Sequence, residues 1–198
     1  MNEHMGDWKL GIRTCGSDYS FMNGDDYGYD PTPYSVLGKL AESGLIHKED
    51  TLVDFGCGRG RVGIYLADRI GCRVIGVDYS MKRIAEAERN LTSYHKKERQ
   101  ADIQFVHSNA ELFDPREANS FYFFNPFSAD IFQKVLLNIC EAKRDTGRDM
   151  HIFFYYPTSE YRCYFEDERR LKLIEDIDCT NARLWDAEVY RILYFSVL

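Results

Sequence analysis

Apolar positions along the chain switch repeatedly between two spacings, and this predicts strands that alternate with helices. Short apolar runs indicate buried strands, and the stretches between them carry apolar residues at three- and four-residue spacing, which indicates helices. The expected strands of this part cover residues 51–55, 73–77, 103–106, 121–124 and 151–156. Strands and helices in alternation build a parallel sheet with helices on both faces.

Three residues predict where helices begin. Thr32 before Pro33 favours a helix start, and Gly44 is expected at the end of that helix. Ser80 and Ser128 are expected to cap two later helices. The inward positions expected for these later helices are Met81, Ile84, Leu91 and Tyr94, then Ile131, Val135, Leu136 and Ile139.

The end of the chain follows a different rhythm. Residues 171–177 and 189–197 are two strand candidates with no long helix between them, which predicts an antiparallel pair closing the sheet. We therefore expect one α/β domain over residues 1–198, a three-layer sandwich with a mostly parallel seven-stranded sheet. Residues 1–31, rich in Gly, Asp and Tyr, are expected to form an irregular arm before a core at 32–198.

Composition narrows the function classes. A length of 198 residues suits one domain, and 44% hydrophobic residues indicate a folded chain. The net charge of −7 disfavours non-specific nucleic-acid binding, although a local basic patch remains open. The chain shows no signal segment and no apolar stretch near the roughly 20 residues of a membrane span, so a cytoplasmic protein without membrane contact is expected.

The cysteines indicate neither disulfides nor a metal site. No two of them form a C-x-x-C pair, and several lie among apolar neighbours, as expected of reduced, buried thiols. The six are Cys15, Cys57, Cys72, Cys140, Cys163 and Cys179. We expect no bound metal.

A glycine-rich loop after the first expected strand carries the strongest chemical signal. It reads Asp54-Phe55-Gly56-Cys57-Gly58-Arg59-Gly60. Glycines let a ligand approach the main chain, and free N–H groups at a helix start can hold a carboxylate. Asp54, at the strand end, is placed to meet a cation.

A second acidic residue, Asp78, ends the next expected strand, 24 residues after Asp54. One carboxylate can accept hydrogen bonds from both hydroxyls of a ribose. Together the two acids and the loop call for a ligand with an anionic end, a cationic end and a ribose.

The run Gly58-Arg59-Gly60-Arg61-Val62-Gly63 also satisfies the dinucleotide pattern G-x-G-x-x-G. If the motif is aligned in this way, Gly56 and Cys57 become extra loop residues and Asp54 has no role in binding. A nicotinamide or flavin cofactor is therefore the weaker interpretation. A purely structural turn is the other alternative.

These residues resemble class I S-adenosylmethionine methyltransferases, which have a Rossmann-like core. VDFGCGRG resembles their first motif and VIGVDYS their second, and the resemblance covers roughly residues 30–198. It implies S-adenosyl-L-methionine as cofactor, its methionine part on the glycine loop, its ribose on Asp78 and its adenine near Tyr79. Asn109-Ala110 matches the Asp-Ala pair that contacts adenine in the third motif.

The arm carries its own resemblance. Residues 26–32, ending at Thr32, are similar to the Tyr-Gly-x-x-Thr element of the non-SET histone-lysine methyltransferases and of some small bacterial-type methyltransferases. The resemblance implies that this segment, with Thr32, folds over the cofactor. An ordinary surface arm is the alternative.

The tip of the fourth expected strand, Asn125-Pro126-Phe127, is the expected catalytic segment. Ligands of open α/β sheets bind beyond the strands' carboxyl ends. The Asn125 side-chain carbonyl and the main-chain carbonyls suit an amine nucleophile, and Phe127 could stack on a substrate or cover the sulfonium. The segment resembles a shortened Asn-Pro-Pro-aromatic motif of amino-directed methyltransferases. The alternative is a turn capped by Asn125 with Phe127 in the core.

We therefore expect an N-directed, S-adenosylmethionine-dependent methyltransferase that acts on a protein side chain or a small-molecule amine. A non-catalytic cofactor-binding module and a nucleic-acid amino methyltransferase are the alternatives. Weaker site candidates are His107, a base or a structural residue, and Arg59 and Arg61, which could bind an anion or face solvent. The charged run at residues 95–99 is expected to be a solvated helix end. Oligomeric state and methyl acceptor stay open.

Overall fold

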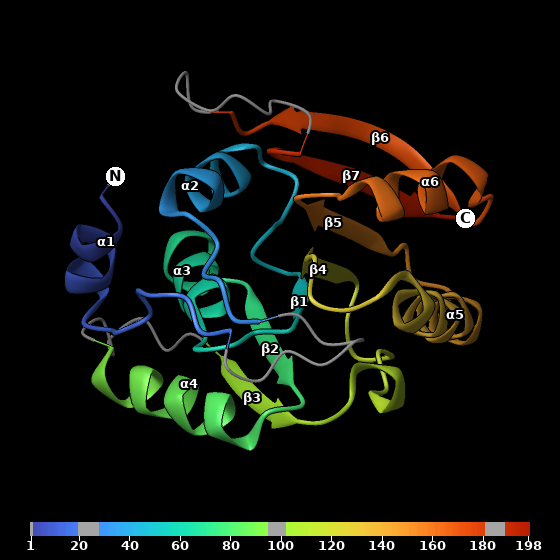
Figure 1. Cartoon of the computed structure of the whole chain (residues 1–198). Helices are drawn as coiled ribbons and strands as arrows, with labels where there is room; N and C mark the ends of the chain where they lie inside the picture. Colours follow the sequence, from blue (N-terminus) through green and yellow to red (C-terminus); the bar gives the residue numbers. More distant parts are fainter. Residues whose placement is uncertain (1, 20–27, 95–101, 181–188) are drawn as a thin grey trace.

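A computed structural model describes residues 2–19, 28–94, 102–180 and 189–198 (Figure 1). It contains a seven-stranded sheet in the order β3-β2-β1-β4-β5-β7-β6. The strands are β1 (Thr51–Phe55), β2 (Arg73–Asp78), β3 (Ile103–His107), β4 (Ser120–Phe124), β5 (His151–Tyr155), β6 (Leu171–Asp178) and β7 (Arg191–Val197). The first five strands of this order are parallel, and β7 is antiparallel to β5 and β6. The expected fold class, including the closing antiparallel pair, is confirmed.

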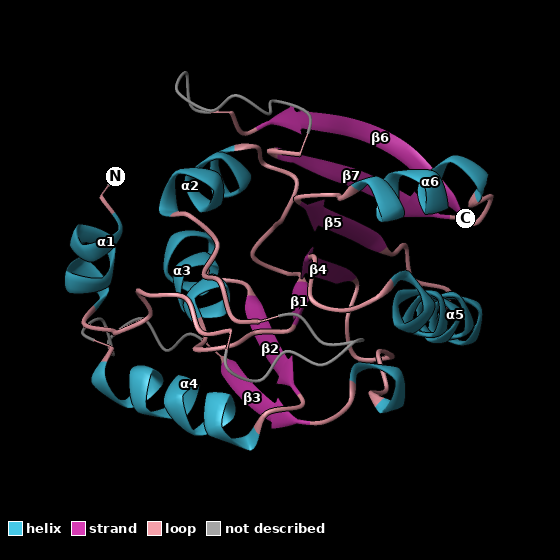
Figure 2. Ribbon diagram, viewed as in Figure 1, coloured by secondary structure: helices cyan, strands magenta, loops and turns pink. Residues whose placement is uncertain are grey.

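Helices lie on both sides of the sheet (Figure 2). They are α1 (Glu3–Leu10), α2 (Tyr34–Glu42), α3 (Arg61–Ile70), α4 (Met81–Ser93), α5 (Ala129–Thr146) and α6 (Ser159–Asp167), with a short 3-10 helix, η1 (Ala110–Leu112). One core joins the sheet to α2 and α3, and the other joins it to α5 and α6.

Alternate side chains of β4 point to opposite faces of the sheet, so they belong to different cores. Phe121 and Phe123 are fully buried on the α5 side, and Tyr122 is buried on the α2 and α3 side. Each such aromatic side chain stabilises the fold by about 1.5–3 kcal/mol through burial. The aromatic strands therefore fix both faces of the sheet at the centre of the domain.

Two helix details differ from the expectation. Pro33, not Thr32, is the residue at the start of α2, and the Thr32 hydroxyl instead lies 3.2 Å from the Tyr122 hydroxyl. Met81 is 66% exposed because it is the first residue of α4, so the prediction of an inward Met81 was wrong. Ser80 caps α4 as expected, and its side chain accepts from the Arg83 N–H. Ser128 is the N-cap residue of α5, as expected, but its side chain makes no capping hydrogen bond.

The N-terminal arm is more ordered than expected. Residues 3–10 form α1, capped by Asn2 and ended by Gly11 in the left-handed conformation. Asp18 and Tyr29 pair in an isolated antiparallel bridge that brings the two sides of the arm together. The charged run at 95–99 lies outside the described residues. Within the described part of the chain, no helix is long and apolar enough to cross a bilayer.

Candidate functional site

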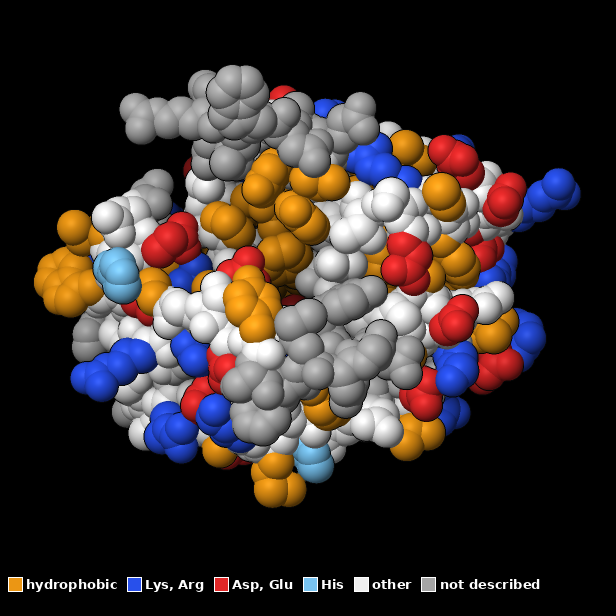
Figure 3. Space-filling view, viewed as in Figure 1, with side chains coloured by type: hydrophobic (Ala, Val, Ile, Leu, Met, Phe, Trp, Pro, Cys, Tyr) orange, Lys and Arg blue, Asp and Glu red, His pale blue; other side chains and the backbone are white. Residues whose placement is uncertain are grey.

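A cavity of about 410 Å³ opens at the carboxyl ends of β1, β2 and β4. Strand β1 lies between β2 and β4, where the strand order reverses and open α/β sheets bind ligands. Figure 3 shows a hollow on this face, with orange hydrophobic side chains in it. Predicted site residues that line the cavity are Thr32, Asp54, Gly56, Cys57, Asp78, Tyr79, Asn109, Ala110, Asn125, Pro126 and Phe127.

Three predicted cofactor residues are not on the cavity wall. Phe55 points away from it, because alternate strand residues face opposite sides, and it stacks on Phe123 in the α5 core. Gly58 and Gly60 lie in the loop, where an added Cβ would come within 2.4 Å of the Tyr29 ring and 2.5 Å of the Phe105 ring. These glycines allow close packing of neighbouring rings.

Gly56 has a different task. Its φ is 77°, and an added Cβ would come within 2.6 Å of Pro126 Cβ. A side chain at this position would therefore collide with the tip of β4. The absence of a side chain at Gly56 lets the glycine loop pack directly against Pro126 of the predicted catalytic segment.

Two buried carboxylates stand on the cavity wall. Asp54 is 2% exposed, and its Oδ2 has no hydrogen-bond partner among the described residues. Burial, and then the nearby Asp78, raise the pKa of Asp54 to about 8. A ligand cation beside Asp54 would provide the missing partner.

Asp78 is held by the backbone. Its Oδ2 accepts from the Gly58 N–H at 3.0 Å, and its Oδ1 accepts from the Ser80 N–H at 2.8 Å. These two hydrogen bonds fix the carboxylate on the cavity wall, and a carboxylate oxygen can accept more than one hydrogen bond. The pair of acids thus fits the amino group and ribose of an amino-acid nucleoside.

The tip of β4 carries a strained backbone. Asn125 has a φ of 41°, which is uncommon outside glycine, and its buried Oδ1 has no partner in the described structure. Pro126 and Phe127 follow it along the cavity, and Phe127 packs edge-on against Phe123. An unpaired acceptor in a strained turn is a feature of functional sites, where a ligand supplies the partner.

Two residues of α6 form hydrogen bonds with the backbone that follows the tip of β4. The hydroxyl of the fully buried Tyr161 donates to the Phe127 carbonyl at 2.6 Å and lies 3.3 Å from the Ser128 carbonyl. The Ala129 N–H donates to Glu160 Oε1 at 3.0 Å. Sequence reasoning missed both residues, since nothing in the local pattern of α6 indicates contact with a turn over 30 positions earlier.

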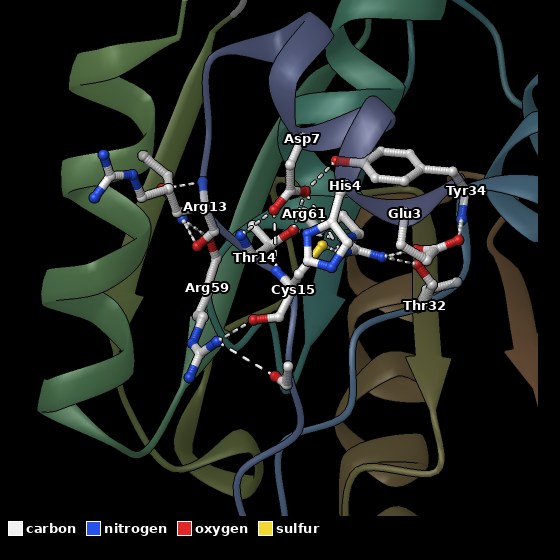
Figure 4. Close-up of polar contacts among 12 residues, drawn as sticks. Glu3, His4, Asp7, Arg13, Thr14, Cys15, Thr32, Tyr34, Arg59 and Arg61 are labelled. Atoms are coloured by element: carbon white, nitrogen blue, oxygen red, sulfur yellow. Dashed lines mark hydrogen bonds and ion pairs between the residues drawn. The ribbon is translucent and has the colours of Figure 1, made fainter. Parts of the chain in front are cut away.

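The N-terminal arm binds the loop side of the cavity through Arg61 (Figure 4). The buried guanidinium of Arg61 pairs with Glu3 and Asp7. It also donates to the Thr14 hydroxyl at 2.6 Å and the Thr32 carbonyl at 3.1 Å. Arg61 is buried, so the alternative of a solvated helix face was wrong, and its guanidinium joins the arm to the start of α3 on the cavity wall.

Arg59 is also engaged by the protein. Its side chain pairs with Glu86 at 3.0 Å, donates to the Cys15 carbonyl at 2.9 Å and lies over the Tyr29 ring. Residues 28–32 line the cavity, and residues 26–27 of the predicted arm element lie outside the described residues. His107 is exposed, and its Nε2 lies 2.8 Å from the Tyr79 carbonyl. It is therefore outside the cavity wall.

Several wall residues were not predicted from the sequence. Tyr122 and Phe124 follow the two-residue period of β4 onto the cavity side, which is a signal that could have found them. Glu111 and Arg83 carried no such signal. Among the described residues, no three His, Cys, Asp or Glu side chains cluster as a metal site, and all six cysteines are free thiols.

Comparison with known proteins places this geometry in a family. Residues 52–142 match the family model described as a methyltransferase domain. This stretch is a class I, S-adenosylmethionine-dependent methyltransferase domain. The matched residues run from β1 into α5 and include the glycine loop, both buried acids and the tip of β4.

Two curated relatives align with short stretches of this chain. A protein-lysine N-methyltransferase of Saccharolobus islandicus is 34% identical over 64 residues, which are 32% of this chain and 40% of the relative. The zinc finger CCCH domain-containing protein 24 of Arabidopsis thaliana is 43% identical over 60 residues, 30% of this chain and 7% of the relative. The alignments thus span less than half of either curated relative.

Among solved structures, an RNA methyltransferase of Salinibacter ruber in complex with S-adenosyl-L-homocysteine has a TM-score of 0.57. It is 18% identical, and the match covers 85% of this chain and 94% of that one. At this identity the likeness concerns the fold.

Proposed function

We propose that this chain transfers a methyl group from S-adenosylmethionine to an amine nitrogen of a protein side chain or a small molecule. The observation that carries the proposal is the buried, unpaired Oδ1 of Asn125, which lies on the same cavity wall as Asp54 and Asp78. An acceptor oxygen with no partner fits a nucleophile that brings N–H donors.

The cofactor assignments are proposed as follows. Asp54 binds the amino group, the loop at Gly56 and Cys57 follows the methionine part, and Asp78 binds the ribose. Tyr79, Asn109 and Ala110 border the adenine. When bound, S-adenosylmethionine supplies an activated methyl group on a positive sulfonium.

The acceptor-side assignments use carbonyl chemistry. Asn125 Oδ1 and the main-chain carbonyls near Pro126 accept hydrogen bonds from the amine and align its lone pair, and Phe127 shields the cavity from water. Proline has no N–H, so no donor competes there for the amine lone pair. Positioning of this kind can lower a barrier by roughly 7–11 kcal/mol, which leaves little need for a strong base.

Charge on the cavity wall favours an amine over a nucleic acid. The wall carries the carboxylates of Asp30, Asp78 and Glu111, of which Glu111 pairs with Lys134 at 3.0 Å, and the carboxyl of Asp54, whose pKa is raised to about 8. Of its two arginines, Arg61 is paired within the protein, so the wall attracts cations and repels phosphodiesters. The partial alignment with a protein-lysine methyltransferase supports a protein amine as acceptor.

Ligand binding tests the cofactor assignment. S-adenosylhomocysteine is expected to raise the melting temperature of the protein, because a ligand that binds only the folded state stabilises it, and NAD is expected not to. A shift with NAD alone would overturn the proposal in favour of the dinucleotide interpretation.

Activity tests the role of Asn125. With labelled S-adenosylmethionine and the protein and small-molecule fractions of a cell lysate, Asn125→Ala is expected to lower methyl transfer by about 10²–10³-fold, the range for loss of one well-placed catalytic hydrogen bond. Binding of S-adenosylhomocysteine should stay unchanged. Gln133→Ala, on the exposed face of α5, is the matched control. Cofactor binding without transfer to any fraction would favour a non-catalytic binding module.

A further inference from the structure

A row of aromatic rings continues outward from the cavity along the carboxyl ends of β4 and β5. Phe124 ends β4 and lines the cavity. Its ring centroid lies 6.0 Å from that of Tyr156, which in turn lies 5.4 Å from that of Tyr190. All three side chains are half-buried, so each presents part of its surface to solvent.

The rings meet at steep angles. The ring planes of Phe124 and Tyr156 are 70° apart, and those of Tyr156 and Tyr190 are 74° apart. Neighbouring rings in this arrangement form corners in which one group can touch two aromatic faces. Corners of this kind bind ammonium groups, because the face of each ring carries negative electrostatic potential.

The backbone of Tyr156 adopts a strained, left-handed conformation. Its φ is 60°, and it shares with Asn125 the positive φ that is rare for residues other than glycine. The Tyr156 N–H donates to the Arg191 carbonyl at 3.1 Å, which ties the turn after β5 to the start of β7. Strain of this kind persists where the surrounding structure fixes it, and it concentrates at ligand-binding positions.

The charges near the row are acidic. Asp30 and Glu111 line the same cavity as Phe124. Asp30 also lies near Tyr155, whose pKa is raised mainly by burial and in part by that negative charge. The wall arginine Arg83 lies over the Tyr29 ring, 5.7 Å from its centroid, and Arg61 is paired with Glu3. The Asp30 carboxylate therefore favours a cationic group at the row, whereas Glu111 is already paired with Lys134 at 3.0 Å.

We propose that Phe124, Tyr156 and Tyr190 form the acceptor-binding surface for a polypeptide, with a lysine side chain passing Phe124 and Tyr156 toward Asn125. This inference rests on the proposed function. The rings contact the aliphatic stem and attract the ammonium, and a partly methylated lysine keeps both interactions. Tyr190, farther along the row, contacts the flanking peptide, which a small free amine would not need.

A nucleobase could also stack on such rings. Its phosphates would then lie beside the carboxylates of Asp30 and Glu111, which disfavours that occupant. The test below includes it as an opposing outcome.

The test measures binding to the complex with S-adenosylhomocysteine by NMR titration. The probes are a pentapeptide of trimethyllysine flanked by two alanines on each side, the same peptide with a neutral tert-butyl group in place of the trimethylammonium, the acetylated single-residue trimethyllysine amide, and a five-residue oligoadenylate. We expect the charged peptide to bind about tenfold tighter than its neutral isostere and tighter than the single-residue amide, a preference within the range of one or two cation–π contacts.

Tyr156→Leu and Phe124→Leu should each weaken binding of the charged peptide about three- to tenfold, whereas Tyr156→Phe should retain it. Tyr164→Phe is the matched control, because its hydroxyl bonds Glu168 on the outer part of α6. Two ring variants keep the test valid if one of them fails to fold, which their melting temperatures reveal.

Equal binding of the neutral isostere, unchanged binding in both leucine variants, or tighter binding of oligoadenylate would overturn the inference alone. Failure of S-adenosylhomocysteine to bind in the first place would overturn the proposed function, and the inference with it.

Discussion

The two halves of the cavity are built by different means. The half under β1 and β2 consists of a glycine loop, backbone N–H groups and two buried carboxylates, all within residues 54–80. The half at β4 consists of Tyr122, Phe124 and the turn at residues 125–127, supported by α6, and the row of rings continues from it to Tyr190. The first half is built from groups close in sequence, as suits the proposed cofactor site, whereas the proposed acceptor surface is assembled from distant elements.

Four measurements sharpen this comparison. The largest effect is expected at Asp78, in the loop half. Asp78→Ala should weaken S-adenosylhomocysteine binding about 10²–10⁴-fold, because two charge-assisted hydrogen bonds are lost at about 1.5–3 kcal/mol each. Isothermal titration calorimetry measures this affinity.

Glu88→Ala is the matched control for Asp78→Ala, because it removes the same charge from the exposed side of α4. If Asp78→Ala bound as tightly as the unchanged protein, the ribose assignment would be wrong, and the loop half would need another ligand.

The second effect concerns pH and Asp54. Because the folded-state pKa of Asp54 is raised to about 8, the carboxyl is protonated in the ligand-free protein at lower pH. An amino group binds the ionised form, so affinity for S-adenosylhomocysteine should increase with pH by up to tenfold per unit as pH approaches 8. Asp54→Asn should remove this dependence, and an unchanged pH profile in that variant would contradict the assignment.

The raised pKa of Asp54 has the opposite consequence for the stability of the ligand-free protein, which should fall as pH rises. Between the ordinary pKa of 3.8 and the raised value, the folded state holds a proton that the unfolded state has released. The contribution of Asp54 to the unfolding free energy is therefore complete below pH 3.8 and falls by up to about 1.4 kcal/mol per pH unit as pH rises toward 8. Denaturant titrations of the protein and of Asp54→Asn across this range should diverge accordingly.

The smallest effect is expected on kcat, at Tyr161 of α6. Tyr161→Phe removes the hydroxyl that donates to the Phe127 carbonyl, a bond of about 1 kcal/mol, and should lower kcat about fivefold by loosening the turn at Asn125. Affinity for S-adenosylhomocysteine should not change, which separates a positioning role from general destabilisation.

Tyr164→Phe removes a hydroxyl from the same helix without touching the turn, so it should leave kcat unchanged. Equal losses of kcat in the two variants would show that α6 acts through stability alone.

The prediction from sequence succeeded where the signal is local. The period of two and the acid after each of two strands placed β1, β2, Asp54 and Asp78 correctly at one edge of the sheet. It failed at Met81 and at the helix start after Thr32, where a side chain's direction depends on what packs beside it. Phe55 was assigned to the site because it lies inside the motif, although its strand position turns it toward α5.

By itself, the sequence determined the α/β class, the closing antiparallel strands and the loop half of the cavity, because hydrophobic period and glycine placement act over a few neighbouring residues. Only the tertiary structure decided that Arg61 forms ion pairs with the arm and that Tyr161 hydrogen-bonds the turn after Asn125. It also decided that Phe124, Tyr156 and Tyr190 form one row. Those contacts join residues tens of positions apart, and they exist only once the strand order brings the ends of β4, β5 and β7 to the same side of the sheet.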